Sequence, residues 1–344
     1  AGLSAKGSVR LAEGGSLERV RFDRLRLGGW LDIPVDLIGQ GKGNPVQVVL
    51  RGGILDLRRA EFGKPNANAP PGPPMIVTLD RLQITDTIAL TGLNGRFDTA
   101  RGLDGAFQAQ LNGGSPVEGR VIPQQGRSAV RLISADAGGV LRAAGLLKQV
   151  VGGQLTLSLL PVGSGGAFDG RLTIGDVRIK DAPGIAALLN AVSVVGLINE
   201  LNGDGIYFDD VEADFRLTPN RLTLTKASAV GASMGLSMDG IYVLDSGQVN
   251  MQGVITPVYL LNGIGSIFTR KGEGLIGFNY TLKGPAKAPN VSVNPLSALT
   301  PGGLREIFRA PAPELPAVDG VTGSTLPAPP PERDKPVVLR GEDR

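Results

Sequence analysis

The chain of 344 residues contains no histidine and no cysteine. Histidine is the side chain whose unperturbed pKa lies near neutrality, so the usual general base is missing. Ser-His-Asp and Cys-His nucleophilic systems, and zinc sites built from His and Cys, are therefore impossible within the chain. Catalysis by two carboxylates, as in glycoside hydrolysis, stays open. The composition favours a protein that is not an enzyme and that needs no cofactor and no metal.

Aromatic residues and excess charge of either sign are also scarce. Aromatic residues make up 4% of the chain, and 35 Lys and Arg face 32 Asp and Glu, for a formal charge of +3. The basic residues form no long tract and do not alternate with aromatic residues, as they do in proteins that bind single-stranded nucleic acid. We therefore expect no nucleic-acid partner.

A signal peptide is not visible at the start of the chain, which begins at Ala1 without a methionine. We interpret the sequence as a piece of a longer protein, with any targeting or anchoring segment upstream. The absence of cysteine shows that the fold needs no disulfide, but it does not identify a compartment.

Alternation of apolar and polar residues with a period of two dominates the chain and predicts strands. The predicted strands are separated by turn sequences such as Pro219-Asn220 and Asp245-Ser246-Gly247. This pattern is typical of an antiparallel β-meander. The apolar face predicted from this alternation comprises Val211, Ala213, Phe215, Leu217, Leu222, Leu224, Met234, Leu236, Met238, Tyr242, Val249, Met251, Ile255, Ile276, Phe278 and Tyr280.

The first part, residues 1–135, is also built from predicted strands, though with less regular alternation. The apolar positions shift phase between Phe22 and Leu25, which suggests a β-bulge. Residues 62–74 are rich in Pro, Asn and Ala and are expected to form a long loop. At the other end, residues 310–344 are rich in Pro and poor in apolar side chains, so we expect a disordered tail.

Two helices are predicted to interrupt the strands, at residues 136–151 and 181–201. For the second, Asp181 is the expected N-cap and Pro183 lies in the first turn. Residues 182–198 carry no charge, but a membrane span needs about 20 apolar residues, and Asn190 and Ser193 interrupt this run. We expect a helix that packs against the sheet or plugs one end of it, although contact with membrane lipid stays open. Its apolar residues are Ile185, Leu188, Leu189, Val192 and Val195.

Two motifs have structural interpretations that are preferred over functional ones. Residues 272–277 match the dinucleotide-binding pattern G-x-G-x-x-G, but a strand and not a helix is predicted to follow, which indicates a turn. The acidic residues between Asp204 and Asp214 lack the spacing of a calcium loop. Asp210, Glu212 and Asp214 alternate on one face of a predicted strand and are interpreted as a polar surface.

The apolar faces allow two architectures. Two such faces can pack together as a closed β-sandwich that binds nothing else, and periodicity alone favours this interpretation. Glycines within the strands, such as Gly235 and Gly253, would also permit a curved, open trough.

Most of the chain, from about Val9 to Phe308, resembles the AsmA-like family. The resemblance rests on residues 234–240, 253–262, 272–275 and 280–285, and is most specific at Pro289-Asn290-Val291-Ser292-Val293-Asn294-Pro295-Leu296 and Arg305-Glu306-Ile307-Phe308. The sequence is similar to the large members of the TamB and YhdP type, which are bridge-like lipid transport proteins of Gram-negative bacteria.

The resemblance implies a mainly β fold, an elongated and curved antiparallel sheet that forms a groove, with two short helical insertions. Residues 1–135 would then be an N-terminal part of the groove that continues from a missing upstream region, and residues 136–309 would be the family's C-terminal groove. The implied function is shielding of phospholipid in the periplasm by a protein attached to the inner membrane, for transport to the outer membrane. The predicted apolar face would line the groove, and the second helix would lie at its end. A structural or partner-binding domain with a closed core is the alternative.

Overall fold

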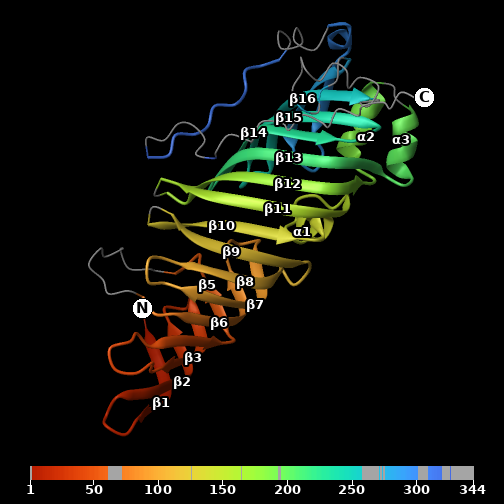
Figure 1. Ribbon diagram of the computed structural model, residues 1–344. Coiled ribbons are helices and arrows are strands. Elements are labelled where there is room, and N and C mark those ends of the chain that lie inside the picture. Colours follow the sequence, from red (N-terminus) through yellow and green to blue (C-terminus); the bar gives the residue numbers. More distant parts are fainter. Residues whose placement is uncertain are drawn as a thin grey trace, which may run out of the picture.

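The computed structural model describes residues 2–60, 72–124, 126–163, 165–192, 195–257, 271, 273, 276–300, 309–319 and 326. These residues form one large sheet of 18 strands that is stacked into an elongated body (Figure 1). The mainly β prediction is thereby confirmed. The strands are β1 Leu3–Leu11, β2 Leu17–Leu27, β3 Leu31–Ile38, β4 Gln47–Arg51, β5 Ile54–Asp56, β6 Met75–Gln83, β7 Ala89–Asp98, β8 Asp104–Leu111, β9 Pro116–Gln124, β10 Arg127–Ser134, β11 Val150–Val162, β12 Ala167–Ile179, β13 Ile206–Thr218, β14 Arg221–Val230, β15 Met234–Val243, β16 Gln248–Pro257, β17 Phe278–Pro285 and β18 Asn290–Asn294.

The order of strands in the sheet follows the order of the chain, and most neighbouring strands are antiparallel. Short turns join many of these neighbours, whereas α1 lies between β10 and β11, and α2 and α3 lie between β12 and β13. The predicted turns at Pro219-Asn220 and Asp245-Ser246-Gly247 connect β13 to β14 and β15 to β16. The meander is broken where β4 and β5 share one position between β3 and β6. Both pair antiparallel with β3 and parallel with β6. Gly52 and Gly53 separate them, each with a positive φ.

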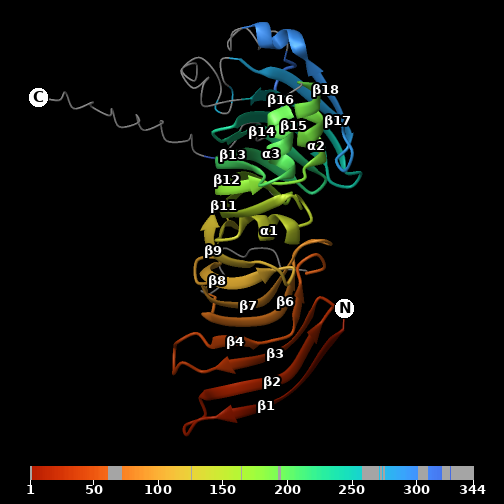
Figure 2. The same ribbon diagram turned by 90° about the vertical axis from the view of Figure 1, so that its right-hand side faces the viewer.

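Bulges help the sheet to curve and twist. The predicted phase shift in β2 is present as an irregular register between Phe22 and Leu25, and similar shifts occur after Asp214 in β13 and after Leu224 in β14. An extra residue on one strand bends that strand and increases its twist. Figure 2 shows the strands as curved bands, with α2 and α3 side by side above α1 on the side that faces the viewer.

The helices are shorter than predicted. The helix expected at 136–151 is α1, Ala137–Ala143, and β11 already begins at Val150. The helix expected at 181–201 is two helices, α2 Pro183–Ala191 and α3 Val195–Asn202. Asp181 has φ 48° and is not the N-cap of α2, which is Ala182 without a side-chain hydrogen bond.

One apolar core runs through most of the sheet. Its buried members extend from Ile33 of β3 to Tyr280 of β17, and include Leu188 and Leu189 of α2. The side chains that form this core lie on one face of the sheet, which we call the inner face. The opposite face is called the outer face.

The C-terminal region contains an extended segment that composition does not predict. Residues 310–319, placed in the disordered tail by the sequence, run in extended form along the outer face of the upper strands (Figure 1). We call residues 309–319 the strap. The rest of the predicted tail, apart from Leu326, lies outside the described residues, as do residues 62–71 of the loop expected at 62–74. A 3₁₀ helix is present at Pro295–Leu299.

Candidate functional site

Apolar residues of neighbouring strands are opposite one another on the inner face. Val211 of β13 is in register with Ala229 of β14, which faces Leu236 of β15. The row continues through Ile255 of β16 to Phe278 of β17. Because paired residues in register point to the same side of a sheet, this row forms an apolar band across five strands.

Three parallel rows extend the band along the strands. The second contains Ala213, Ala227, Met238, Gly253, Tyr280 and Val293, the third Phe215, Leu224, Gly240, Met251, Leu282 and Val291, and the fourth Leu217, Leu222, Tyr242 and Val249. Met234 lies two residues before Leu236, on the same face of β15, and is opposite Pro257. Every predicted lining residue except Ile276 therefore lies on one face. We call the inner face of β11–β18 the trough.

Ile276 does not belong to this surface. It precedes β17, which begins at Phe278, and its side chain is 51% exposed. The strand predicted to follow residues 272–277 is present as β17, whereas Gly272, Gly274 and Leu275 of the motif lie outside the described residues.

The trough also includes strands β11 and β12, whose contribution the sequence prediction omitted. Leu155 faces Ile174, which in turn faces Val211. Leu157 and Leu172 occupy the next row beside Ala213. The alternation of apolar and polar residues at 155–159 is the sequence signal for this contribution.

Part of the trough is accessible to solvent. Val211, Ala213, Phe215 and Leu217 are all only half-buried, whereas a closed sandwich would bury the apolar face of a central strand. On the same strand, Arg216 of the outer face is fully buried. The usual arrangement of an apolar interior and a polar exterior is thus partly inverted at β13.

Glycines in the trough leave space for aromatic side chains of the adjacent strand. Gly170 of β12 faces Phe215 of β13, and a Cβ atom on Gly170 would lie 2.2 Å from Cζ of Phe215. Outside the trough, on β9 and β8, Gly119 has the same relation to Phe107, at 2.1 Å. Each aromatic ring therefore covers the backbone of a glycine on the adjacent strand, and a larger residue there would lift the ring.

Helices α2 and α3 lie across the C-terminal part of the trough. Helix α2 contacts β18, whereas α3 contacts β13, five positions away in the sheet. The sheet therefore wraps around the helix pair. Leu188 and Leu189 are buried in the core, and Ile185 and Val192 pack against it. The side chain of Val195 lies outside the described residues.

Buried ion pairs hold the outer face together. Arg216 donates to both carboxylate oxygens of Asp169, at 2.7 and 3.1 Å, and to the carbonyl of Pro316 in the strap. Arg309 of the strap pairs with Asp239 and with Glu273, the latter at 2.8 Å. Desolvation lowers the pKa of Arg309, but the two carboxylates outweigh it and the pKa is raised.

The acidic residues of β13 are also engaged in ion pairs. Lys271 pairs with Asp210 and, at 2.9 Å, with Glu212, while Arg171 pairs with Asp214 at 2.7 Å. All three acidic residues are partly buried, so the polar surface expected there is partly covered. Within the described ranges, no group of three potential metal-binding side chains occurs.

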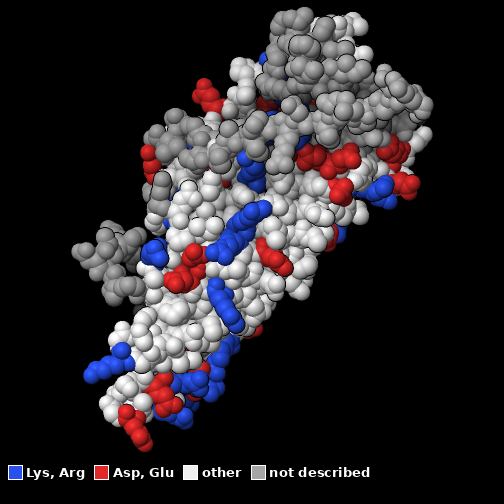
Figure 3. Space-filling model, in the orientation of Figure 1, with Lys and Arg blue, Asp and Glu red and all other residues white. Residues whose placement is uncertain are grey.

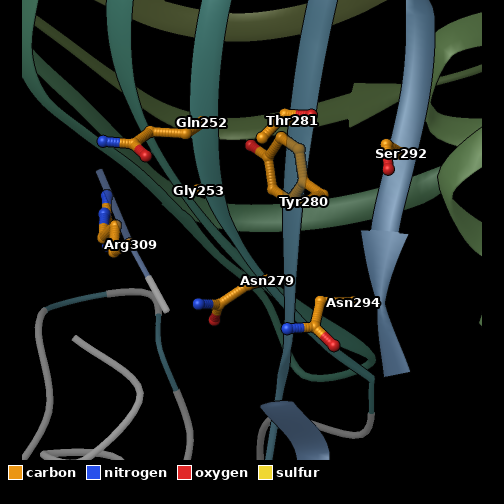
Figure 4. Close-up of a pocket in the computed structure, with 8 residues that line it drawn as sticks. All are labelled: Gln252, Gly253, Asn279, Tyr280, Thr281, Ser292, Asn294 and Arg309. Carbon is orange, nitrogen blue, oxygen red and sulfur yellow. The ribbon is translucent and has the colours of Figure 1, made fainter. Parts of the chain in front are cut away.

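A small polar cavity of about 90 Å³ lies beside the strap on β16–β18. Figure 4 shows Arg309 and Gln252 on one side and Asn279 and Asn294 on another. The cavity is too small for an acyl chain and is lined by polar groups. Tyr280 lies next to it, donates a hydrogen bond to the carbonyl of Ser237 and has a pKa raised by burial.

None of the helices in the described part of the chain is long and apolar enough to cross a membrane. Comparison of the sequence and structure with family models, with curated proteins and with solved structures finds no match.

Proposed function

We propose that the chain is the C-terminal segment of an AsmA-like envelope protein that shields phospholipid acyl chains in the trough. The observation that carries this proposal is the row of half-buried apolar side chains from Val211 to Leu217, continuous with the core along the inner face. A surface of this kind binds through apolar contact and needs no reactive group. The lack of His and Cys is compatible with such a role.

The energetic argument concerns the cost of exposing a lipid tail to water. Each CH₂ group contributes about 0.8 kcal/mol to transfer, so a chain of sixteen carbons costs roughly 13 kcal/mol. A trough that replaces water with Leu, Val and Phe side chains removes most of this barrier. Its length along the sheet would let a tail move without a catalytic step.

The location and partners follow from the same proposal. The full-length protein would be attached to the inner membrane and extend through the periplasm, with phospholipid as cargo and a protein of the outer membrane or envelope as a further partner. It would have a role in outer-membrane biogenesis.

Photocrosslinking tests the cargo directly. A photoreactive residue at Leu236 or Phe278, both half-buried on the inner face, should crosslink to phospholipid in cells. Leu282 and Lys283 are neighbours on opposite faces of β17 and provide a matched pair. We expect lipid adducts from Leu282 and none from Lys283. Native mass spectrometry after gentle extraction should detect bound phospholipid.

A carboxylate in the trough should abolish binding without unfolding the chain. Ala213→Asp places a charge among half-buried residues, where lipid would have to desolvate it. Thr156→Asp on the outer face is the control. Loss of lipid in Ala213→Asp with retention in the control supports the proposal.

The alternative is a structural or partner-binding domain with a closed core and no lipid. It is favoured by the complete burial of Met234 and Ile255 in the region that the helices cover. Absence of lipid by mass spectrometry, together with no adduct from Leu236, Phe278 or Leu282, would establish this alternative and overturn the lipid proposal.

A further inference from the structure

The outer face carries a row of arginines that crosses strands β7–β12. The row comprises Arg96, Ala106, Arg120, Arg131, Ser158 and Arg171, one residue in register from each strand. We call it the arginine row. In Figure 3, long basic side chains lie one above another across the middle of the visible face.

Part of this row is electrostatically unfavourable within the described part of the chain. Arg120 and Arg131 are directly opposite each other on β9 and β10, and like charges in this position destabilise a sheet. Arg120 is compensated by Asp104 at 3.0 Å and Arg171 by Asp214 at 2.7 Å. For the exposed side chains of Arg96 and Arg131, the described residues provide no ion-pair partner. A bound anion would neutralise the guanidinium groups of Arg96 and Arg131.

A second row of hydroxyl, amide and carboxylate groups runs beside the first. It contains Thr78, Asn94, Gln108 and Glu118, in register on β6–β9 and two residues along each strand from the arginine row. Thr78 donates to Asn94 at 3.1 Å and Gln108 to Glu118 at 3.4 Å. A surface depression of about 480 Å³ is lined by residues of both rows, among them Arg96, Asn94 and Gln108.

We propose that this strip of the outer face binds an acidic polysaccharide whose chain runs across the strands, along the long axis of the sheet. Guanidinium groups recognise carboxylates bidentately, and amides and hydroxyls can both donate to and accept from sugar hydroxyls. Neighbouring strands are about 4.8 Å apart, so the two rows offer closely repeated contacts to a repeating polymer. Neither row contains an aromatic residue on which a nucleic-acid base could stack. This proposal does not depend on lipid in the trough.

The test uses polygalacturonate, a polymer of carboxylated sugars, with dextran as its neutral counterpart. The purified chain should bind polygalacturonate and not dextran, with an affinity that falls as salt rises. The double variant Arg96→Gln/Arg131→Gln should weaken binding roughly tenfold, or about 1.4 kcal/mol. The control Lys6→Gln/Arg19→Gln removes the same charge from β1 and β2 and should leave the affinity unchanged. All four positions are exposed, so thermal unfolding should change little.

Two further measurements separate this partner from other anions. Asn94→Ala/Gln108→Ala should weaken binding of polygalacturonate but not of polyphosphate, which has no sugar hydroxyls. Vesicles of phosphatidylglycerol should not compete with polygalacturonate. No binding of polygalacturonate, equal losses in the arginine variant and its control, or competition by vesicles would each overturn the proposal.

Discussion

Arg309 is the residue on which the stability of the outer face depends most clearly, because it pairs with two buried carboxylates. Its guanidinium compensates two carboxylates, Asp239 and Glu273, that are 1% and 2% exposed. Asp239 also accepts a hydrogen bond from Gln252, and Glu273 accepts one from Ser237. A buried carboxylate without a cation pays its desolvation cost in full.

The first prediction is that Arg309→Met destabilises the fold. Breaking a buried ion pair by removing one partner costs about 3–5 kcal/mol, and two carboxylates lose their cation here. Urea unfolding at neutral pH should show this loss. The triple variant Arg309→Met/Asp239→Asn/Glu273→Gln should regain much of the stability, because no charge stays buried. A triple variant no more stable than the single one would contradict this account.

Asp32 links stability to pH at the other end of the molecule. It accepts two hydrogen bonds from Arg24, both at 2.8 Å, and a third from Arg26. The Arg24 hydrogen bonds, aided by Arg26 and opposed by desolvation, lower the pKa of Asp32 from 3.8 to about 2. A pKa lowered by folding stabilises the native state above the unfolded value, and this contribution disappears as pH falls through the folded value.

The second prediction is that Asp32→Asn lowers the melting temperature at neutral pH by a small amount, because the group is exposed. The difference from the unmodified chain should shrink as pH falls from 3.8 towards about 2. Thermal melts over this range measure it. Arg24→Gln should reproduce the effect, and the double variant should add little to either change. A difference that grows on acidification would refute the assignment.

At the scale of elements, paired strands depend on close contact between glycine and aromatic residues. A Cβ atom on Gly170 has no room because the ring of Phe215 occupies that space. The third prediction is that Gly170→Ala destabilises the fold and displaces the ring into the trough. Chemical denaturation should show the lower stability. In Gly170→Ala/Phe215→Leu, the smaller flexible side chain should recover part of the loss, and the two changes should therefore be non-additive.

Strand positions were predictable because alternation and turn residues agree with each other. The repeated pattern around Pro219-Asn220 identifies β13 and β14 and gives the side chains that share a face. Helix boundaries were less predictable. The sequence does not reveal that Gly145 has a positive φ and follows the end of α1, or that Val150 is buried in a strand. Asp181 also adopts a positive φ. Aspartate is a common N-cap residue, so the residue type alone predicted the wrong N-cap.

The strap was missed for a different reason. The strap contains three prolines, and Leu315 and Val318 are its only apolar residues larger than alanine, which resembles the composition of a disordered segment. Its order comes from distant partners, because Arg309 pairs with Asp239 and the carbonyl of Pro316 accepts from Arg216. Contacts across 70 and 100 residues leave no local pattern in a sequence.

For the whole molecule, the two faces of the sheet have different roles. In β13 the apolar face stays half-open, whereas the polar face is covered and carries a fully buried Asp169–Arg216 pair. The free energy that keeps the upper strands in place thus comes partly from the outer face. Because the outer face contributes to the stability of the fold, apolar side chains of the trough can stay accessible to solvent while the sheet remains folded.

The last prediction concerns this division of roles and uses two truncations. A chain ending at Leu326 keeps the strap, and its unfolding midpoint should stay close to that of the full chain. A chain ending at Thr300 removes the strap, leaves Asp239 and Glu273 without Arg309, and removes the carbonyl of Pro316 from Arg216. Its midpoint should fall, and hydrogen exchange should increase in β12–β16 more than in β6–β9, which the strap does not contact. Uniform exchange throughout the sheet would instead mean that the strap stabilises the molecule as a single cooperative unit.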